Sequence, residues 1–189
     1  MNIIILGPQG SGKGTQAKLL AEKYGLTNIS SGKLLREFAK GDSEKAKLIA
    51  DLLTTGALLP FDTVMEVIEP AMVGSKSGFI LDGSPRDLMQ AEYLDWFLGE
   101  RHITIDKVIH IDIPREESLN RLAKRAITEN RSDDTPDAIH ERLDIYEKDT
   151  MPVIDYYRKQ GKMIDVDGVG EVPEIFNAII SKLEVSSRA

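Results

Sequence analysis

Five short apolar segments alternate along the chain with longer stretches of helical periodicity. Their residue ranges are 2–6, 27–29, 78–82, 107–113 and 163–167. The third and fourth are almost entirely apolar at their centres, which is typical of strands covered on both faces. Because parallel strands need crossover connections, the alternation predicts a doubly wound α/β fold around a five-stranded parallel sheet.

Two stretches do not follow this alternation. Residues 31–60 show no strand pattern but carry leucine, isoleucine and phenylalanine at helical spacing, which predicts a small helical insert. Residues 126–135 are polar and charged and too short for a folded subdomain, so we expect a flap. Thr135 and Pro136 are typical of a helix start, and Pro152 is expected to bend or end that helix.

Composition narrows the class of protein. The chain has 189 residues, 41% of them hydrophobic, which is enough for one substantial core and one main domain. Its net charge of -7 argues against a nucleic-acid partner, because such proteins carry basic stripes that neutralise phosphates. The absence of cysteine excludes disulfides and cysteine-ligated zinc. No apolar run approaches the roughly 20 residues that cross a bilayer, so we expect a soluble, cytoplasmic protein without a membrane partner.

The most specific motif is the glycine-rich sequence GPQGSGKGT at residues 7–15, between the first predicted strand and a helical stretch. Glycines let backbone N–H groups converge on phosphate oxygens, the following helix presents its positive end, and Lys13 can reach a terminal phosphate. In the common GxxxxGK[ST] pattern a hydroxyl residue follows the lysine, whereas here Gly14 takes that position and Thr15 follows. The motif predicts a site for a nucleoside triphosphate.

A second motif is the carboxylate at the end of the third predicted strand. Residues 78–82 read GFILD, and the turn sequence GSPR follows. At the end of a buried strand, Asp82 would orient Mg²⁺ through its water molecules, because Mg²⁺ sheds its hydration reluctantly and bridges phosphate oxygens. An aspartate that only begins a turn is the alternative, and the phosphate loop upstream favours Mg²⁺ binding.

Six arginines lie near predicted strand ends or in the two unusual stretches, and all are candidates for phosphate binding. Planar guanidinium groups suit phosphate oxygens, and phosphoryl transfer between two anionic nucleotides requires cations around donor and acceptor. The six are Arg36, Arg86, Arg121, Arg125, Arg131 and Arg142. For any single arginine a solvated surface position is the alternative; Arg121, for instance, has Glu117 four residues before it.

Histidines and aromatic residues give no comparable pattern. His102, His110 and His140 lack metal-ligand spacing and are interpreted as ordinary surface or core residues. Trp96 and the tyrosines are expected to pack in the core or in a groove. No serine, histidine and aspartate set indicates a covalent nucleophile, and phosphoryl transfer needs none because it relies on positioning and charge.

The motifs combine into a pattern that covers most of the chain. The loop sequence Gly12-Lys13-Gly14-Thr15-Gln16 is joined by residues 29–32, 35–36, 78–83, 85–86 and 90–92, and by Arg131, Asp133, Asp134 and Arg142. With these positions the chain resembles the adenylate kinases over residues 1–183. The resemblance implies a P-loop NTPase fold in three parts. These are a core (1–29, 60–120 and 136–189), a helical insert that binds the nucleoside monophosphate (30–59), and a short lid without zinc (121–135).

The resemblance also implies an activity and a set of site residues. The reaction is the Mg²⁺-dependent, direct in-line transfer of a phosphoryl group from ATP to AMP, giving two ADP. The expected ATP-binding residues are Gly10, Ser11, Gly12, Lys13, Gly14, Thr15, Arg121, Arg125 and Gly168. The expected AMP-binding residues are Ser31, Arg36, Leu58, Gly83, Arg86, Gln90, Arg131 and Arg142. The transfer step would depend on Lys13, Arg86, Arg125, Arg131 and Arg142.

Within these sets the resemblance assigns finer roles. Thr15 and Asp82 would organise Mg²⁺ through water, and Arg121 would stack on the donor adenine. Ser31 and Gln90 would help to recognise the acceptor base. The lid aspartates, Asp133 and Asp134, would order the lid arginines when the lid closes and expels water. The protein is expected to act as a monomer.

Several residues depart from the family pattern, mostly around the acceptor pocket. They are Pro8, Gln9, Ser31, Lys33, Phe61 and Ser84. Two alternatives to an AMP kinase therefore stay open: a kinase for UMP or CMP, and a non-catalytic nucleotide-binding relative. A nucleotide-hydrolysing switch is a third class, but the guanine motif NKxD is absent from the sequence.

Overall fold

The computed structural model describes residues 1–129 and 135–186, and its centre is a five-stranded parallel sheet. The strands are β1 (Ile3–Leu6), β2 (Thr27–Ser30), β3 (Phe79–Asp82), β4 (Lys107–Asp112) and β5 (Met163–Asp167). Their order in the sheet is β2-β3-β1-β4-β5, and neighbouring strands pair in parallel. The predicted doubly wound five-stranded fold is confirmed, with strand boundaries within one residue of those expected.

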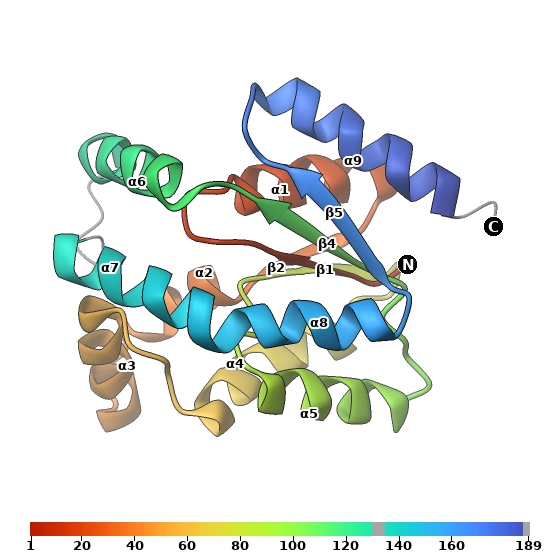
Figure 1. The fold of residues 1–189 in the computed structure, drawn as a ribbon. Helices are drawn as coiled ribbons and strands as arrows, with labels where there is room; N and C mark the ends of the chain where they lie inside the picture. Colours follow the sequence, from red (N-terminus) through yellow and green to blue (C-terminus); the bar gives the residue numbers. More distant parts are fainter. Residues whose placement is uncertain (130–134, 187–189) are drawn as a thin grey trace.

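Helices cover both faces of this sheet (Figure 1). On one face α1 (Lys13–Tyr24) and α9 (Val172–Ser186) pack against Ile3 and Ile5 of the central strand. On the other face α4 (Phe61–Val73), α5 (Leu88–Gly99) and α8 (Met151–Lys159) pack against Ile4 and Leu6. Successive side chains of a strand point to opposite faces, so the run of four apolar residues in β1 serves both cores.

The remaining helices gather at the end of the sheet toward which the strands point (Figure 1). They are α2 (Ser31–Phe38), α3 (Glu44–Thr55), α6 (Arg115–Glu129) and α7 (Pro136–Ile145). The prediction of a helical insert in residues 31–60 is confirmed by α2 and α3. The expected flap at 126–135 is wrong at its beginning, because α6 continues to Glu129; residues 130–134 lie outside the described part of the chain.

The helix start at Thr135 has the predicted capping geometry. Its hydroxyl accepts a hydrogen bond from the Ala138 N–H at 3.2 Å, and Pro136 occupies the first turn, where its missing N–H is not needed. Pro152 does not end the helical run. Instead a single π-helical turn, η1 (Tyr146–Thr150), joins α7 to α8 and places Pro152 in the first turn of α8.

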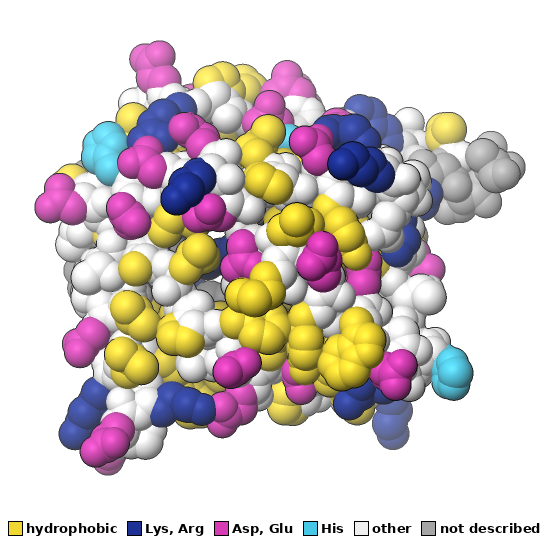
Figure 2. Space-filling model, turned by 60° about the horizontal axis from the view of Figure 1, so that its bottom comes forward, with side chains coloured by type: hydrophobic (Ala, Val, Ile, Leu, Met, Phe, Trp, Pro, Cys, Tyr) yellow, Lys and Arg dark blue, Asp and Glu magenta, His cyan; other side chains and the backbone are white. Residues whose placement is uncertain are grey.

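Trp96 is the clearest error of the sequence analysis within the fold. Its side chain is 58% exposed on α5, beside the Tyr93 ring at a centroid distance of 5.3 Å. Leu88, Met89 and Met151 are exposed as well. Figure 2 shows a face of the molecule on which hydrophobic and acidic side chains lie side by side. The hydrophobic periodicity of a helix does not show whether one of its aromatic side chains is exposed to solvent. Of the helices in the described ranges, none is long and apolar enough to span a membrane.

Candidate active site

A cavity of about 720 Å³ opens at the carboxyl ends of the strands. Its wall is formed by the loop after β1, by the ends of β2 and β3, and by parts of α2, α3, α6, α7 and η1. In doubly wound sheets this edge is where ligands bind, because the loops that follow neighbouring strands diverge there. Register brings the motifs together, since Asp82 pairs with Ile5 on one side and with Ser30 on the other.

The charge of this wall is strongly positive. Among residues that the structure describes, the lining cations are Lys13, Lys18, Lys33, Arg36, Arg86, Arg121, Arg125 and Arg142. Asp82 is the lining carboxylate within the same residues. So many cations in one cavity favour a ligand that carries several negative charges.

The loop of residues 7–15 forms one side of the cavity. Gly7 comes so close to β4 that a Cβ atom there would lie 2.3 Å from the Ile111 carbonyl oxygen, so only glycine fits. Gly12 has φ +86° and ends the loop directly before α1 begins at Lys13. The first N–H groups of a helix have no partner within the helix, and the helix dipole is positive at this end. The loop geometry therefore fits an anion such as a phosphate.

Lys13 is the cation of this loop. Its Nζ donates a hydrogen bond to the Pro8 carbonyl at 2.8 Å. Burial lowers the pKa of Lys13 to about 8; the Asp82 carboxylate opposes this shift, while Arg86 and Arg125 add to it. An anionic ligand beside Lys13 would stabilise the charged amine and oppose this shift.

Asp82 occupies the end of β3, opposite the loop. Its Oδ2 lies 3.5 Å from the Ser30 hydroxyl, and a Cβ atom on Gly14 would also lie 3.5 Å from that oxygen. A side chain at this atypical motif position would lie in ordinary van der Waals contact with the carboxylate. Asp82 and Thr15 both line the cavity with hard oxygen ligands, which fit a Mg²⁺ ion that keeps most of its water. Such a site does not need a cluster of three acidic or histidine ligands, and the described residues contain none.

Arg86 follows this carboxylate and lies among like charges. Its Nε donates to the Gly83 carbonyl at 2.9 Å, which fixes the guanidinium plane. Burial lowers the pKa of Arg86, as do Arg142 and, to a smaller extent, Arg36; Asp82 acts in the opposite direction. Three guanidinium groups that repel one another would all be stabilised by a shared phosphate.

Arg142 ties the helical insert to α7. Its side chain is 8% exposed, and its Nη2 donates to the Leu53 carbonyl on α3 at 2.8 Å. Next to this contact Gly56 ends α3 with φ +81°, and a Cβ atom on it would lie 2.6 Å from the Ala138 carbonyl oxygen. A glycine at this helix end thus allows α3 and α7 to approach closely over the cavity.

Arg121 connects the phosphate loop to the loop after β5. It pairs with Glu117 at 2.6 Å, as the surface interpretation of this arginine predicts. It also lines the cavity, and it donates to the carbonyls of Gly10 at 3.5 Å and Gly168 at 3.1 Å. The ion pair holds the guanidinium at the site instead of drawing it away. Stacking on an adenine stays a prediction.

Two residues that were predicted to bind the acceptor nucleotide lie behind the cavity wall. Ser31 is buried and donates to the Asp82 carbonyl at 3.1 Å, in contact with Gly83. Gln90 is also buried, and its side-chain oxygen accepts the Arg86 N–H at 2.9 Å. Both side chains therefore support the backbone that carries Asp82 and Arg86. Their expected role in recognising a base stays a prediction.

Other predicted positions are not part of the cavity wall. Ser11 is buried inside the phosphate loop. The Gly168 carbonyl accepts a hydrogen bond from Arg121. Leu58 lies in the chain between the wall residues Ala57 and Leu59. Three predicted lid residues lie outside the described residues: Arg131, Asp133 and Asp134.

The structure adds wall residues that the sequence analysis did not select. They are Gln9, Lys18, Asn28, Leu53, Gly56, Ala57, Ile145, Tyr146 and Thr150, among others. Thr150 also donates from its hydroxyl to the Arg86 carbonyl at 2.7 Å. Gln9 belongs to the phosphate loop, and Lys18 and Asn28 lie on α1 and β2, whereas the residues from Leu53 onward reach the cavity through the packing of α3, α7 and η1 against the sheet edge. Lys33, which departs from the family pattern, lies on the wall as well.

Comparison with known proteins agrees with this geometry. A family described as "Adenylate kinase" matches residues 5–162. The chain is 39% identical over 186 residues to an adenylate kinase of Bifidobacterium longum, covering 97% of this chain and 100% of the relative. It is 38% identical over 186 residues to one of Stenotrophomonas maltophilia, with coverages of 97% and 100%. It is 37% identical over 213 residues to one of Archaeoglobus fulgidus, with coverages of 97% and 98%.

Proposed function

Because the chain belongs to the adenylate kinase family, we propose that it is a nucleoside monophosphate kinase that transfers a phosphoryl group from ATP to AMP, reversibly, to give two ADP. The observation that carries this proposal is the wall of cationic side chains around one cavity that begins at a phosphate loop. Phosphoryl transfer depends on positioning and on neutralising the charge of the transferred group, and this wall supplies both.

The donor would bind along the phosphate loop. Loop N–H groups and Lys13 would hold the β- and γ-phosphates, and a phosphate next to Lys13 would restore the positive charge that burial disfavours. Arg121, fixed by Glu117 and by two backbone carbonyls, would lie against the nucleoside of the donor. Arg125 would reach the transferring phosphate from the same helix.

The acceptor would bind on the opposite side of the cavity. Arg36, Arg86 and Arg142 converge there from α2, the turn after β3, and α7. Their mutual repulsion favours a dianionic phosphate between them, so the oxygen of the acceptor phosphate would face the γ-phosphate of the donor for direct in-line attack. The proton balance is simple, because a phosphate oxygen attacks without a general base.

Mg²⁺ would neutralise charge on the donor phosphates. We propose that Thr15 and Asp82 hold the ion, in part through water, because both line the cavity beside the loop and offer the hard oxygen atoms that Mg²⁺ prefers.

Water is a competing acceptor, so the cavity must close before transfer. We propose the three-part division of the family for this chain: a core, a helical insert (30–59) and a short lid (121–135). The contact of Arg142 with Leu53 and the approach of Gly56 to Ala138 support a closed arrangement of insert and α7. We also propose that the protein acts as a monomer in the cytoplasm, since one chain supplies the cationic groups of both sides of the cavity.

A coupled assay tests the reaction. We expect ADP to form from ATP, Mg²⁺ and AMP, with little free phosphate in the absence of AMP. Phosphate release without AMP would indicate a hydrolase, and nucleotide binding without either product would indicate a non-catalytic relative. Rates with AMP, dAMP, CMP, UMP and GMP test the acceptor. Lys33 on the cavity wall and Ser31 behind it are the observations that favour a different acceptor, and AMP is expected to give the highest kcat/KM.

A further inference from the structure

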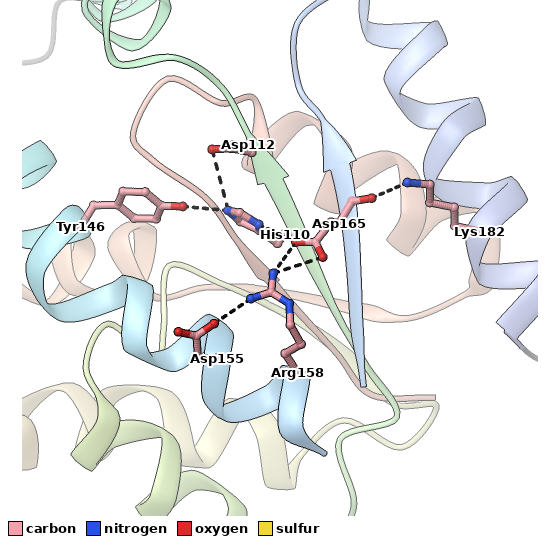
Figure 3. A network of polar contacts seen from close by, with 7 residues as sticks. All are labelled: His110, Asp112, Tyr146, Asp155, Arg158, Asp165 and Lys182. Carbon is pink, nitrogen blue, oxygen red and sulfur yellow. Dashed lines mark hydrogen bonds and ion pairs between the residues drawn. The ribbon is translucent and has the colours of Figure 1, made fainter. Parts of the chain in front are cut away.

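His110 lies on β4, next to Leu6 of the central strand, and is 5% exposed. Both ring nitrogens have partners (Figure 3). Nδ1 is 2.9 Å from Oδ1 of Asp165, and Nε2 is 2.8 Å from the Tyr146 hydroxyl. A carboxylate can only accept, so Nδ1 carries the hydrogen, and in the neutral ring Nε2 accepts the hydrogen bond that the Tyr146 hydroxyl donates.

The carboxylate behind His110 is firmly held. Burial alone would raise the pKa of Asp165, but hydrogen bonds from His110 and Arg158 outweigh burial and lower the pKa. Arg158 donates to both oxygens of Asp165 at 3.0 and 3.2 Å and also pairs with Asp155 at 2.7 Å (Figure 3). The backbone of Asp165 is held too, because the Lys182 amine donates to its carbonyl. The ring of His110 therefore has a fixed orientation.

The hydroxyl in front of His110 stays protonated. Burial raises the pKa of Tyr146, and the carboxylates of Asp112 and Asp165 raise it further. The Asp112 carboxylate lies 4.0 Å from the same His110 nitrogen, beyond hydrogen-bond distance. The Tyr146 hydroxyl is thus a donor whose acceptor is set by Asp165 through His110.

Tyr146 is also the first residue of η1 and part of the cavity wall. At the other end of this π-helical turn, Thr150 donates to the Arg86 carbonyl at 2.7 Å. One helical turn before Tyr146, Arg142 points into the cavity and donates to Leu53. The π-turn therefore contacts the backbone of Arg86 and directly continues the helix that carries Arg142. The Met151 N–H donates to the Tyr146 carbonyl across this turn, so the backbone and the side chain of Tyr146 are both held.

We propose that His110 is a positioning residue for phosphoryl transfer. By accepting the Tyr146 hydroxyl it fixes the π-turn, and through that turn it fixes the directions of Arg86 and Arg142. This inference rests on the proposed kinase function. A histidine that only satisfies hydrogen bonds in the core would affect stability without affecting the rate of transfer. A positioning role for His110 predicts an effect on that rate.

The test compares four variants by steady-state kinetics with ATP, Mg²⁺ and AMP: two single variants, their double variant and a control. Tyr146→Phe and His110→Leu are each expected to lower kcat about threefold to tenfold, with KM for AMP changed by less than about twofold. The double variant is expected to lose no more than either single variant, because both remove the same interaction. Tyr157→Phe is the matched control: this buried tyrosine donates to Asp95 at 3.3 Å, away from the cavity wall, and is expected to keep its kcat.

A conservative replacement sharpens the test. His110→Gln keeps a side-chain acceptor for Tyr146 and is expected to recover most of the kcat that His110→Leu loses. Urea unfolding of every variant shows whether each one is folded at the assay temperature; if His110→Leu is not, Tyr146→Phe alone carries the test. Unchanged kcat in folded Tyr146→Phe, or an equal loss in Tyr157→Phe, overturns the inference while the unmodified protein remains an active kinase. An unmodified protein without kinase activity instead overturns the proposed function, and the inference falls with it.

Discussion

The two sides of the cavity are built in different ways. The phosphate loop of the donor side is a run of nine consecutive residues, 7–15, whose geometry follows largely from glycine conformations and from the start of α1. The acceptor side joins residues that lie far apart in the sequence, and the Arg142 to Leu53 hydrogen bond spans 89 positions. A local site needs little from the rest of the fold, whereas a non-local site depends on packing. Substitution of Lys13 in this loop should therefore change activity alone, and substitutions on the acceptor side should change activity and stability together.

The largest effect is expected on the donor side, from Lys13→Ala. Removing a cation that faces the transferred phosphoryl group should lower kcat/KM by at least about 10² to 10³-fold. The free energy of unfolding should not fall, because a buried amine with a lowered pKa is removed. Coupled assays and urea unfolding measure the two quantities. Lys23→Ala, an exposed change in the last turn of the same helix, is the control and should keep full activity. Near-normal transfer in Lys13→Ala would remove the phosphate-loop assignment.

On the acceptor side, Arg142→Ala should lower both kcat/KM and the free energy of unfolding. Loss of one guanidinium from the acceptor site is expected to reduce kcat/KM by about 10²-fold. The free energy of unfolding should fall by about 1 to 3 kcal/mol, because the Leu53 carbonyl loses a buried donor. Arg115→Ala is the matched control, since it breaks ion pairs with Asp144 and Glu147 at the surface. If Arg142→Ala loses activity but keeps its full free energy of unfolding, the acceptor side does not depend on this long-range contact for its stability.

The pH dependence of nucleotide binding should report the protonation of Lys13 on the donor side. Lys13 loses its proton at a pKa of about 8 in the folded, ligand-free protein, so the affinity for MgATP should fall as the pH rises above 8, by up to about tenfold per pH unit. Lys13→Arg keeps the charge, and calorimetric titration of this variant should show a flat profile. Between pH 8 and 10.5 the unfolded chain binds more protons at Lys13 than the folded chain does. The contribution of this group to the unfolding free energy therefore rises with pH over that window.

The smallest effect on activity is expected at two helix ends, where a pair of substitutions separates the cost of backbone conformation from the cost of close approach. Gly25 and Gly56 both end a helix with positive φ, but only Gly56 faces another backbone, at Ala138. Gly25→Ala should cost about 1 kcal/mol of unfolding free energy, from the left-handed conformation alone. Gly56→Ala should cost about 1 to 3 kcal/mol more and raise KM for AMP, because α3 and α7 must separate. Equal losses in urea unfolding would mean that the two helices do not need this approach.

Local patterns predicted much of the fold and of the donor side. The five strands, the helical insert, the cap at Thr135 and the phosphate loop each depend on residues that are neighbours in the sequence. Those patterns did not predict the exposure of Trp96 or the length of α6. Both depend on what covers a helix and where its last turn finds support, and a hydrophobic pattern carries neither.

The resemblance to a family selected arginines that the fold then brings to one cavity, but it did not explain how they are held. Ser31 and Gln90 hold the backbone behind the wall, and Thr150 holds Arg86 from a π-turn that no periodicity indicates. His110 had no local signal either, because its partners come from β5 and η1.

Short segments of the sequence set the succession of strands and helices along the chain, the anion-binding loop and the position of Asp82 at a strand end. Each of these follows from side-chain periodicity or from backbone conformations that only a few consecutive residues set. The tertiary structure alone decided which distant side chains share the cavity, which of the polar residues support it from behind, and how closely α3 approaches α7. These features depend on contacts between elements, and the free energy of such contacts comes from packing that no short segment of the chain contains.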